Sequence, residues 1–227
     1  MEVVLKSKKR NELKLMQAIL SYLKENCPEK ICYAPMGDSI SQGLFAENRK
    51  SGFVFKLADQ LAMATGKKIK LRGLSEVGKT ATDFGAPCLP MIIRQKPALV
   101  TIEFGTNDAF EGPTPTNLQL YRNSLKKIIE SLKEKTDSQI ILMTAWTNPK
   151  YPVTSSIIQF DQVCREVGAK LEVPVADLSD IWRNRSDVFG PAGRLIPDFS
   201  KWGGSDDFHP NQRGHQLIAE KLFKIIK

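Results

Sequence analysis

The stretch ALVTIEFGTND (residues 98–108) indicates the fold class of this chain. It opens with a nearly continuous apolar run, ALVTIEF, and closes with glycine, asparagine and aspartate, which favour turns. A second run of this kind, QIILMTA, occupies residues 139–145. Uninterrupted apolar strands of this length are typical of parallel sheets covered on both faces by helices. The two runs therefore predict a parallel sheet in an α/β protein.

Shorter β-rich segments and helical patterns alternate with these two strands. We expect further strands near residues 31–36, 68–73 and 174–178. Apolar residues at helical spacing predict helices over residues 53–64, 83–94, 118–133, 155–171 and 211–226. Strands that alternate with helices in this way form a doubly wound sheet with right-handed crossovers.

Length and composition favour one globular domain. The 227 residues suit one α/β domain, so we expect a single domain over residues 1–227, with an amphipathic helix within residues 1–27 packed on it. No apolar run approaches the roughly 18 residues that a membrane-spanning helix requires. The N-terminus has a basic cluster but neither the apolar core nor the cleavage site of a signal peptide. We therefore expect a cytoplasmic protein, unless a leader has been removed.

The charge of the chain is positive but dispersed. Lysine and arginine together number 33 against 25 acidic residues, a net charge of +8. The lysines are scattered, and aromatic residues do not alternate with them as a stacking surface for nucleic acid requires, so we expect no nucleic-acid partner. The four cysteines form no CxxC pair and no cluster with histidine, which argues against a zinc site and favours free thiols.

Four short polar blocks lie where a doubly wound sheet binds its ligands, outside the carboxyl ends of strands. GDSI (residues 37–40) follows the first strand, and Gly78 lies in the loop after the second. GTND (residues 105–108) follows the third strand, and DDFHPN (residues 206–211) precedes the last helix. Each block is common by itself, but the four together at these positions indicate a catalytic site.

These blocks resemble those of the GDSL, or SGNH, hydrolase family, which carry an invariant serine, glycine, asparagine and histidine. The corresponding residues of this chain are Ser39, Gly78, Asn107 and His209. The resemblance implies a three-layer α/β/α sandwich around a five-stranded parallel sheet of flavodoxin-like topology. It also implies hydrolysis of esters or thioesters of small acids, lipids or sugars, or the transfer of acyl groups.

The resemblance assigns a role to each matching residue. Ser39 is the expected nucleophile and His209 the general base that takes its proton. Asp206 is expected to orient His209, because the family spacing is Asp-x-x-His, and Asp207 is the competitor for that role. The family's oxyanion hole corresponds here to two backbone N–H groups and one side-chain amide, those of Ser39, Gly78 and Asn107.

The second block departs from the family pattern and also matches a phosphate-binding motif. Residues 73–80, GLSEVGKT, are longer than the usual Gly-x-Ser-Gly-x-Thr by two residues between Ser75 and Gly78, which leaves Gly73 as the second choice for the oxyanion glycine. Residues 73–80 match the P-loop pattern G-x-x-x-x-G-K-[ST]. However, Gly85 and two prolines interrupt the helix that must follow a P-loop. Nucleotide binding also leaves the other three blocks unexplained, so it is the minor alternative.

The sequence therefore predicts a serine esterase that forms an acyl-enzyme on Ser39. Short acyl groups on carbohydrates are favoured, because the chain is compact. Three tryptophans are candidates for stacking on sugar rings and equally for positions in the core or as loop anchors, Trp146, Trp182 and Trp202. Residues 110–117 and 146–153 are expected to shape the pocket. An acyltransferase that uses the same site and a sugar or polymer hydroxyl as acceptor is the alternative. We expect neither a metal nor a cofactor, and the oligomeric state is not predicted.

Overall fold

A computed structural model describes residues 19–190 and 207–227 of the chain. Its strands are Lys30–Gly37 (β1), Lys68–Leu71 (β2), Leu74–Ser75 (β3), Leu99–Glu103 (β4), Gln139–Met143 (β5) and Val175–Ala176 (β6). Its longer helices are Ile19–Asn26 (α2), Phe53–Thr65 (α4), Ala86–Arg94 (α5), Pro115–Lys135 (α7), Thr154–Lys170 (α8) and Gln212–Ile226 (α10). Short helices follow three of the strands, at Ser39–Gln42 (α3), Thr106–Phe110 (α6) and Ser179–Trp182 (α9).

The strands form one parallel sheet in the order β2-β1-β4-β5-β6. The short strand β3 pairs with Met36 and Gly37 of β1. Because β4 occupies the other side of these two residues, β3 must lie on the β2 side and continue that edge. The six strand segments therefore fill five positions, and the predicted doubly wound α/β/α fold is confirmed.

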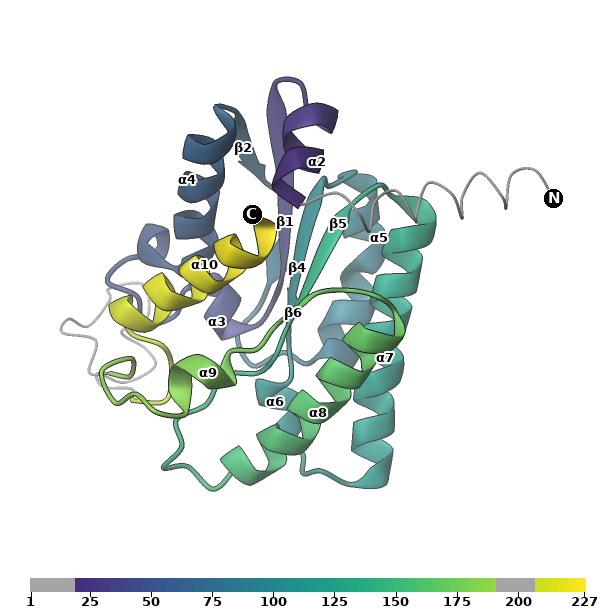
Figure 1. The fold of residues 1–227 in the computed structure, drawn as a ribbon. Helices are drawn as coiled ribbons and strands as arrows, with labels where there is room; N and C mark the ends of the chain where they lie inside the picture. The colour runs from purple at the N-terminus through teal and green to yellow at the C-terminus, as the bar shows by residue number, and fades with distance from the viewer. Residues whose placement is uncertain (1–18, 191–206) are drawn as a thin grey trace.

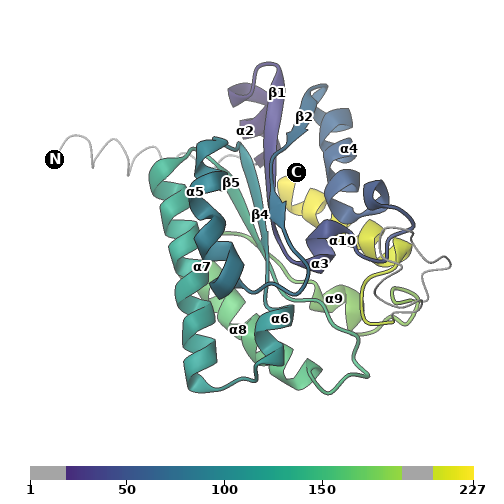
Figure 2. The ribbon, with the colours of Figure 1, turned by 180° about the vertical axis from the view of Figure 1, so that it is seen from behind.

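Helices cover both faces of the sheet. On one face α4 packs against α10 and α2, and on the other α7 packs against α5 and α8 (Figure 1). The same two layers are seen from behind in Figure 2. All residues of β4 and β5 are buried, as their apolar sequences predict for strands between two helical layers. No helix among the described residues is long and apolar enough to cross a membrane.

Local capping explains where the structure differs from the expected helix bounds. Helix α7 begins before residue 118, because the Thr114 side chain accepts a hydrogen bond from the Asn117 N–H and Pro115 suits the first helical turn. The helix expected over residues 83–94 is divided into a π-helical turn, Ala81–Gly85, and α5. At Gly85 a Cβ atom would lie 2.8 Å from the Phe104 ring, so this turn packs unusually close to the end of β4.

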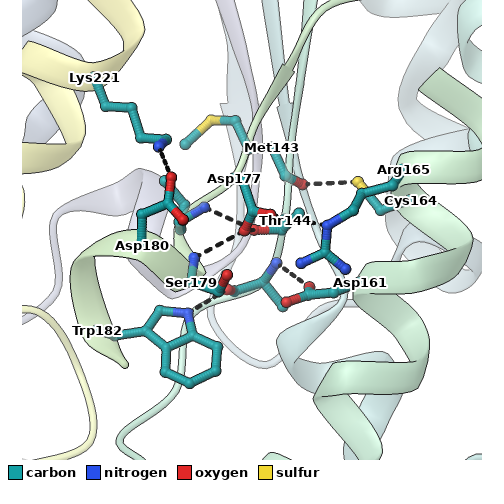
Figure 3. Close-up of polar contacts among 12 residues, drawn as sticks. Met143, Thr144, Asp161, Cys164, Arg165, Asp177, Ser179, Asp180, Trp182 and Lys221 are labelled. Carbon is teal, nitrogen blue, oxygen red and sulfur yellow. Dashed lines mark hydrogen bonds and ion pairs between the residues drawn. The ribbon is translucent and has the colours of Figure 1, made fainter. Parts of the chain in front are cut away.

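Buried polar groups join β5 and β6 to α8 and α9 (Figure 3). Asp161 of α8 accepts a 2.8 Å hydrogen bond from the Ala145 N–H, while its second oxygen is buried without a partner among the described residues. Asp177, which follows β6, accepts hydrogen bonds from Arg165 of α8 and from the N–H of Ser179. Burial raises the pKa of Asp161 to about 7. In the folded protein this carboxyl group therefore stays protonated at pH values well above its ordinary pKa.

We predict that Asp161→Asn reduces the pH dependence of stability. A carboxyl with a raised pKa in the folded state stabilises the fold fully below its unfolded pKa, and that contribution is lost as the pH rises through about 7. The free energy of unfolding, measured in urea, should therefore fall between about pH 5 and pH 8 in both proteins. The fall in the variant should be smaller than that in the wild type by about 2 kcal/mol. Asp59→Asn, at an exposed position of α4, is the control and should keep the wild-type slope. An unchanged slope in Asp161→Asn would contradict the assignment.

Candidate active site

The turn after β1 places Ser39 at the start of α3. Asp38 caps this helix, since its Oδ1 accepts a 2.9 Å hydrogen bond from the Ile40 N–H. Gly37 packs too closely for a side chain: a Cβ atom there would lie 2.1 Å from Ser41 Oγ and 2.7 Å from Glu103 Oε2. The glycine therefore lets the serine turn lie directly on the end of β4.

Glu103 is fully buried beneath this turn. Its Oε2 accepts a 2.9 Å hydrogen bond from the Ser41 hydroxyl and a longer one, 3.5 Å, from the Asp38 N–H. Burial, and then the neighbouring Asp38 carboxylate, raise the pKa of Glu103 well above its usual range. Burial also raises the pKa of Asp38 to about 6. Two buried carboxyl groups thus support the serine turn, and we infer that Glu103 carries a proton.

Ser39 and His209 come from opposite ends of the chain and meet at this edge of the sheet. Ser39 Oγ lies 2.9 Å from His209 Nε2, within hydrogen-bond distance. Ser39 is buried, and the imidazole is half-buried in the segment before α10. A hydroxyl hydrogen-bonded to an imidazole is the arrangement that general-base activation of a serine requires.

Asn107 connects the first three blocks. Its amide nitrogen donates to Asp38 Oδ2 at 2.9 Å and to the Lys79 carbonyl at 3.0 Å. The amide is therefore held between the serine turn and the loop that contains Gly78. Gly78 is exposed and has φ +75°, a left-handed conformation that favours glycine, although a Cβ atom there would meet no other atom within 4 Å. Gly73, the second choice, packs against β1, where a Cβ atom would lie 2.0 Å from the Pro35 carbonyl oxygen.

The loop over residues 73–80 is not built like a phosphate-binding loop. Leu74 and Ser75 form strand β3, so two residues of the motif pair with β1 instead of remaining in an open loop. The Lys79 ammonium lies 4.0 Å from the carboxylate of Glu76 in its own loop and 3.7 Å from that of Asp83 in the following π-helical turn. This geometry argues against the nucleotide-binding alternative.

Asp108 and His215 are buried and accept hydrogen bonds from the backbone. Asp108 accepts hydrogen bonds from the N–H groups of Gly105, at 3.0 Å, and Ala81, at 3.2 Å, and burial raises its pKa to about 7. His215 is fully buried in α10, where its Nδ1 accepts a 3.3 Å hydrogen bond from the Phe53 N–H. Burial lowers the pKa of His215 to about 4, so this ring is neutral at pH 7 and serves packing.

The predicted orienter of His209, Asp206, lies outside the described residues. Its competitor, Asp207, directs its carboxylate to the ammonium of Lys150 and the hydroxyl of Tyr151. Those two partners belong to the loop that follows β5. Asp207 therefore links this loop to the segment that carries His209.

The same loop holds the backbone immediately before His209. The indole N–H of Trp146 donates to the Phe208 carbonyl at 2.9 Å, and the Asn148 amide donates to the Asp207 carbonyl at 2.7 Å. We name these two contacts, with the Lys150 and Tyr151 contacts to Asp207, the histidine anchor. The sequence suggested that the loop shapes the pocket, but it gave no sign of these hydrogen bonds, because they join residues about 60 positions apart.

Two of the three tryptophans do not offer surfaces for sugar rings. Trp146 is 0% exposed and Trp182 is 1% exposed, and the Trp182 indole N–H donates to the Ala145 carbonyl. The expectation that these two rings stack on a substrate is therefore wrong, and Trp202 lies outside the described residues. Among the described residues, no group of three or more histidine, cysteine or acidic side chains is placed to hold a metal ion.

Comparisons with known proteins give the family of the chain. Residues 36–217 match the sequence profile of the GDSL-like Lipase/Acylhydrolase family. The uncharacterized protein YpmR of Bacillus subtilis (strain 168) is 22% identical in an alignment of 232 positions. That alignment covers 88% of this chain and 82% of that protein.

Solved structures share the fold. The structure of TesA superposes with a TM-score of 0.66 at 25% identity, over 86% of this chain and 98% of that one. Axe2, an acetylxylan esterase from Geobacillus stearothermophilus, has a TM-score of 0.63 at 21% identity, over 88% of this chain and 94% of that one. The lipase Lip_vut3 from a goat rumen metagenome has a TM-score of 0.67 at 18% identity, over 86% of this chain and 97% of that one.

We predict that Asn148→Ala loosens the segment around His209. The variant loses one hydrogen bond to the Asp207 carbonyl, worth about 1 kcal/mol, so exchange of the backbone amides in residues 207–211 should become about fivefold faster. Hydrogen–deuterium exchange measured by mass spectrometry tests this. Asn26→Ala is a matched control, because Asn26 also donates to a backbone carbonyl, that of Tyr22 in α2, and it should leave these amides unchanged. Equal exchange in both variants would contradict the histidine anchor.

Proposed function

The chain belongs to the GDSL-like lipase/acylhydrolase family of ester hydrolases, and we propose that it works through a serine nucleophile, Ser39, activated by His209. The observation that carries the proposal is the 2.9 Å contact between Ser39 Oγ and His209 Nε2. It lies at the carboxyl ends of the parallel strands, where doubly wound sheets bind their ligands.

The proposed reaction proceeds in two steps. Ser39 Oγ attacks the ester carbonyl carbon while His209 Nε2 takes the hydroxyl proton, which gives a tetrahedral oxyanion. The carbon–oxygen bond to the alcohol then breaks, and the histidine returns the proton to the departing oxygen. Water, deprotonated by the same histidine, attacks the acyl-enzyme and releases the acid, with Ser39 restored. No group beyond the chain and water is needed to balance these steps.

The oxyanion is proposed to receive hydrogen bonds from the backbone N–H groups of Ser39 and Gly78 and from the Asn107 amide. Asn107 supports this role because Asp38 and the Lys79 carbonyl fix its amide nitrogen between the two loops. An oxyanion would compete with the neutral Lys79 carbonyl for one of the two amide hydrogens, and a charged acceptor forms the stronger bond. Asp206 remains the proposed orienter of His209, on the Asp-x-x-His spacing.

The proposed substrates are short acyl esters, with acetylated carbohydrates as the favoured class. The support is the fold that the chain shares with an acetylxylan esterase, at 21% identity.

We predict that a fluorophosphonate probe labels Ser39 in the folded protein. Its phosphorus mimics the ester carbonyl, so the serine hydroxyl activated by His209 should form a stable adduct, and peptide mass spectrometry locates it. Ser39→Ala should give no adduct, and His209→Gln should label about 10³-fold more slowly, because the general base is lost. Ser155→Ala, at an exposed serine of α8, should label as the wild type does. A folded protein that yields no adduct on Ser39 would refute the serine mechanism.

A further inference from the structure

Three aromatic side chains lie in contact beside His209. The Phe208 ring lies 5.7 Å from the His209 ring between centroids, and Tyr151 packs edge-on against Phe208 at 5.2 Å. Phe110, at the end of α6, is a further neighbour of Phe208, and the centroids of these two rings lie 5.9 Å apart. We call Phe110, Phe208 and Tyr151 the aromatic shelf. It joins residues from three separate segments: α6, the loop after β5 and the segment before α10.

The shelf is accessible to a ligand. Phe110 is 62% exposed, and Phe208 and Tyr151 are half-buried. Among the described residues, the other exposed large apolar side chains are aliphatic or methionine, at Met63, Met91, Leu120 and Ile158. A single exposed apolar residue needs no explanation, but an exposed ring that continues an aromatic cluster up to a reactive histidine suggests a binding surface.

Two members of the shelf are held in place by hydrogen bonds. The Tyr151 hydroxyl donates to the Asp207 carboxylate, and the Phe208 carbonyl accepts from the Trp146 indole. Both contacts belong to the histidine anchor, so the Tyr151 ring and the backbone of Phe208 are held together with the segment that carries His209. A surface that is ordered before binding loses little conformational entropy when a ligand packs on it.

The position of the shelf selects the alcohol portion of the ester. In the proposed mechanism His209 protonates the departing alkoxide, so that oxygen must lie within hydrogen-bond distance of Nε2. Groups attached to it then extend over the neighbours of the imidazole. One neighbour, Phe45, has its ring 5.3 Å away but is only 9% exposed. Among the described neighbours of the imidazole, Phe208 is the one whose ring contacts an exposed ring, that of Phe110.

We propose that the aromatic shelf binds the ring of the ester's alcohol portion and that Phe110 is a specificity-determining residue. The inference rests on the proposed function. Its ligand class is an alcohol with an apolar ring face, either the C–H face of a pyranose or an aryl group, which packs on the exposed Phe110 ring. A small alkyl alcohol such as ethanol does not reach beyond His209 to contact Phe110. The acyl group lies on the other side of the carbonyl carbon and does not contact the shelf.

Phe110→Ala tests the proposal with two series of esters. With acetyl as the constant acyl group, KM for phenyl acetate and for an O-acetylated methyl xyloside should rise about tenfold, because ring packing is lost. The kinetic constants for ethyl acetate should stay at the wild-type values. With p-nitrophenol as the constant alcohol, the ranking of acyl chain lengths should not change. Phe110→Tyr keeps the ring and should have the wild-type KM values for phenyl acetate and the xyloside.

Met63→Ala is the matched control, since it removes an exposed apolar side chain of α4 and should change no KM. Melting temperatures confirm that each variant is folded. An equal loss on ethyl acetate, or a changed acyl-length ranking with unchanged xyloside KM, would overturn the proposal. Those outcomes differ from failure of the proposed function, in which the wild-type protein hydrolyses none of these esters and gives no fluorophosphonate adduct on Ser39.

Discussion

The pairing of β1 with β4 sets the geometry of the serine side of the site. The two strands are parallel, and their register sets Gly37 opposite Glu103, so both strands end at the same level. The turns that follow them must then lie side by side. This brings Asn107 within 2.9 Å of Asp38, although the two residues are 69 positions apart. The close approach requires glycine at position 37, where any side chain would collide with Glu103 and Ser41.

This register also concentrates buried acidic groups beneath the nucleophile. Burial raises the pKa values of Asp38, Glu103 and Asp108, and backbone N–H donors oppose the effect at each of the three. Burial of three carboxylates together is unfavourable, so protonation of Glu103 is the expected relief. The arrangement lowers the stability of the fold at high pH. It also fixes the serine turn through hydrogen bonds to both its side chains and its backbone. Polar networks of this kind hold a single geometry because few alternatives satisfy all their hydrogen bonds.

The histidine half of the site depends on a different set of contacts. His209 lies on an irregular segment, and the loop after β5 holds that segment through Trp146, Asn148 and the partners of Asp207. The same contacts fix Tyr151 and Phe208, two members of the aromatic shelf. Positioning of the general base and the shape of the proposed alcohol surface are therefore coupled through one loop.

The parallel sheet, its helical layers and the residue blocks at the strand ends could be predicted from the sequence, because strand burial and turn formation depend on residues close together in the chain. The candidate nucleophile and base could also be predicted from it, through a family resemblance. The structure was needed to show that Glu103 lies beneath the serine turn, that Trp146 and Trp182 are buried and that Phe110 contacts Phe208. These contacts join distant segments, and strand register and loop packing, which set them, leave no local pattern in the sequence.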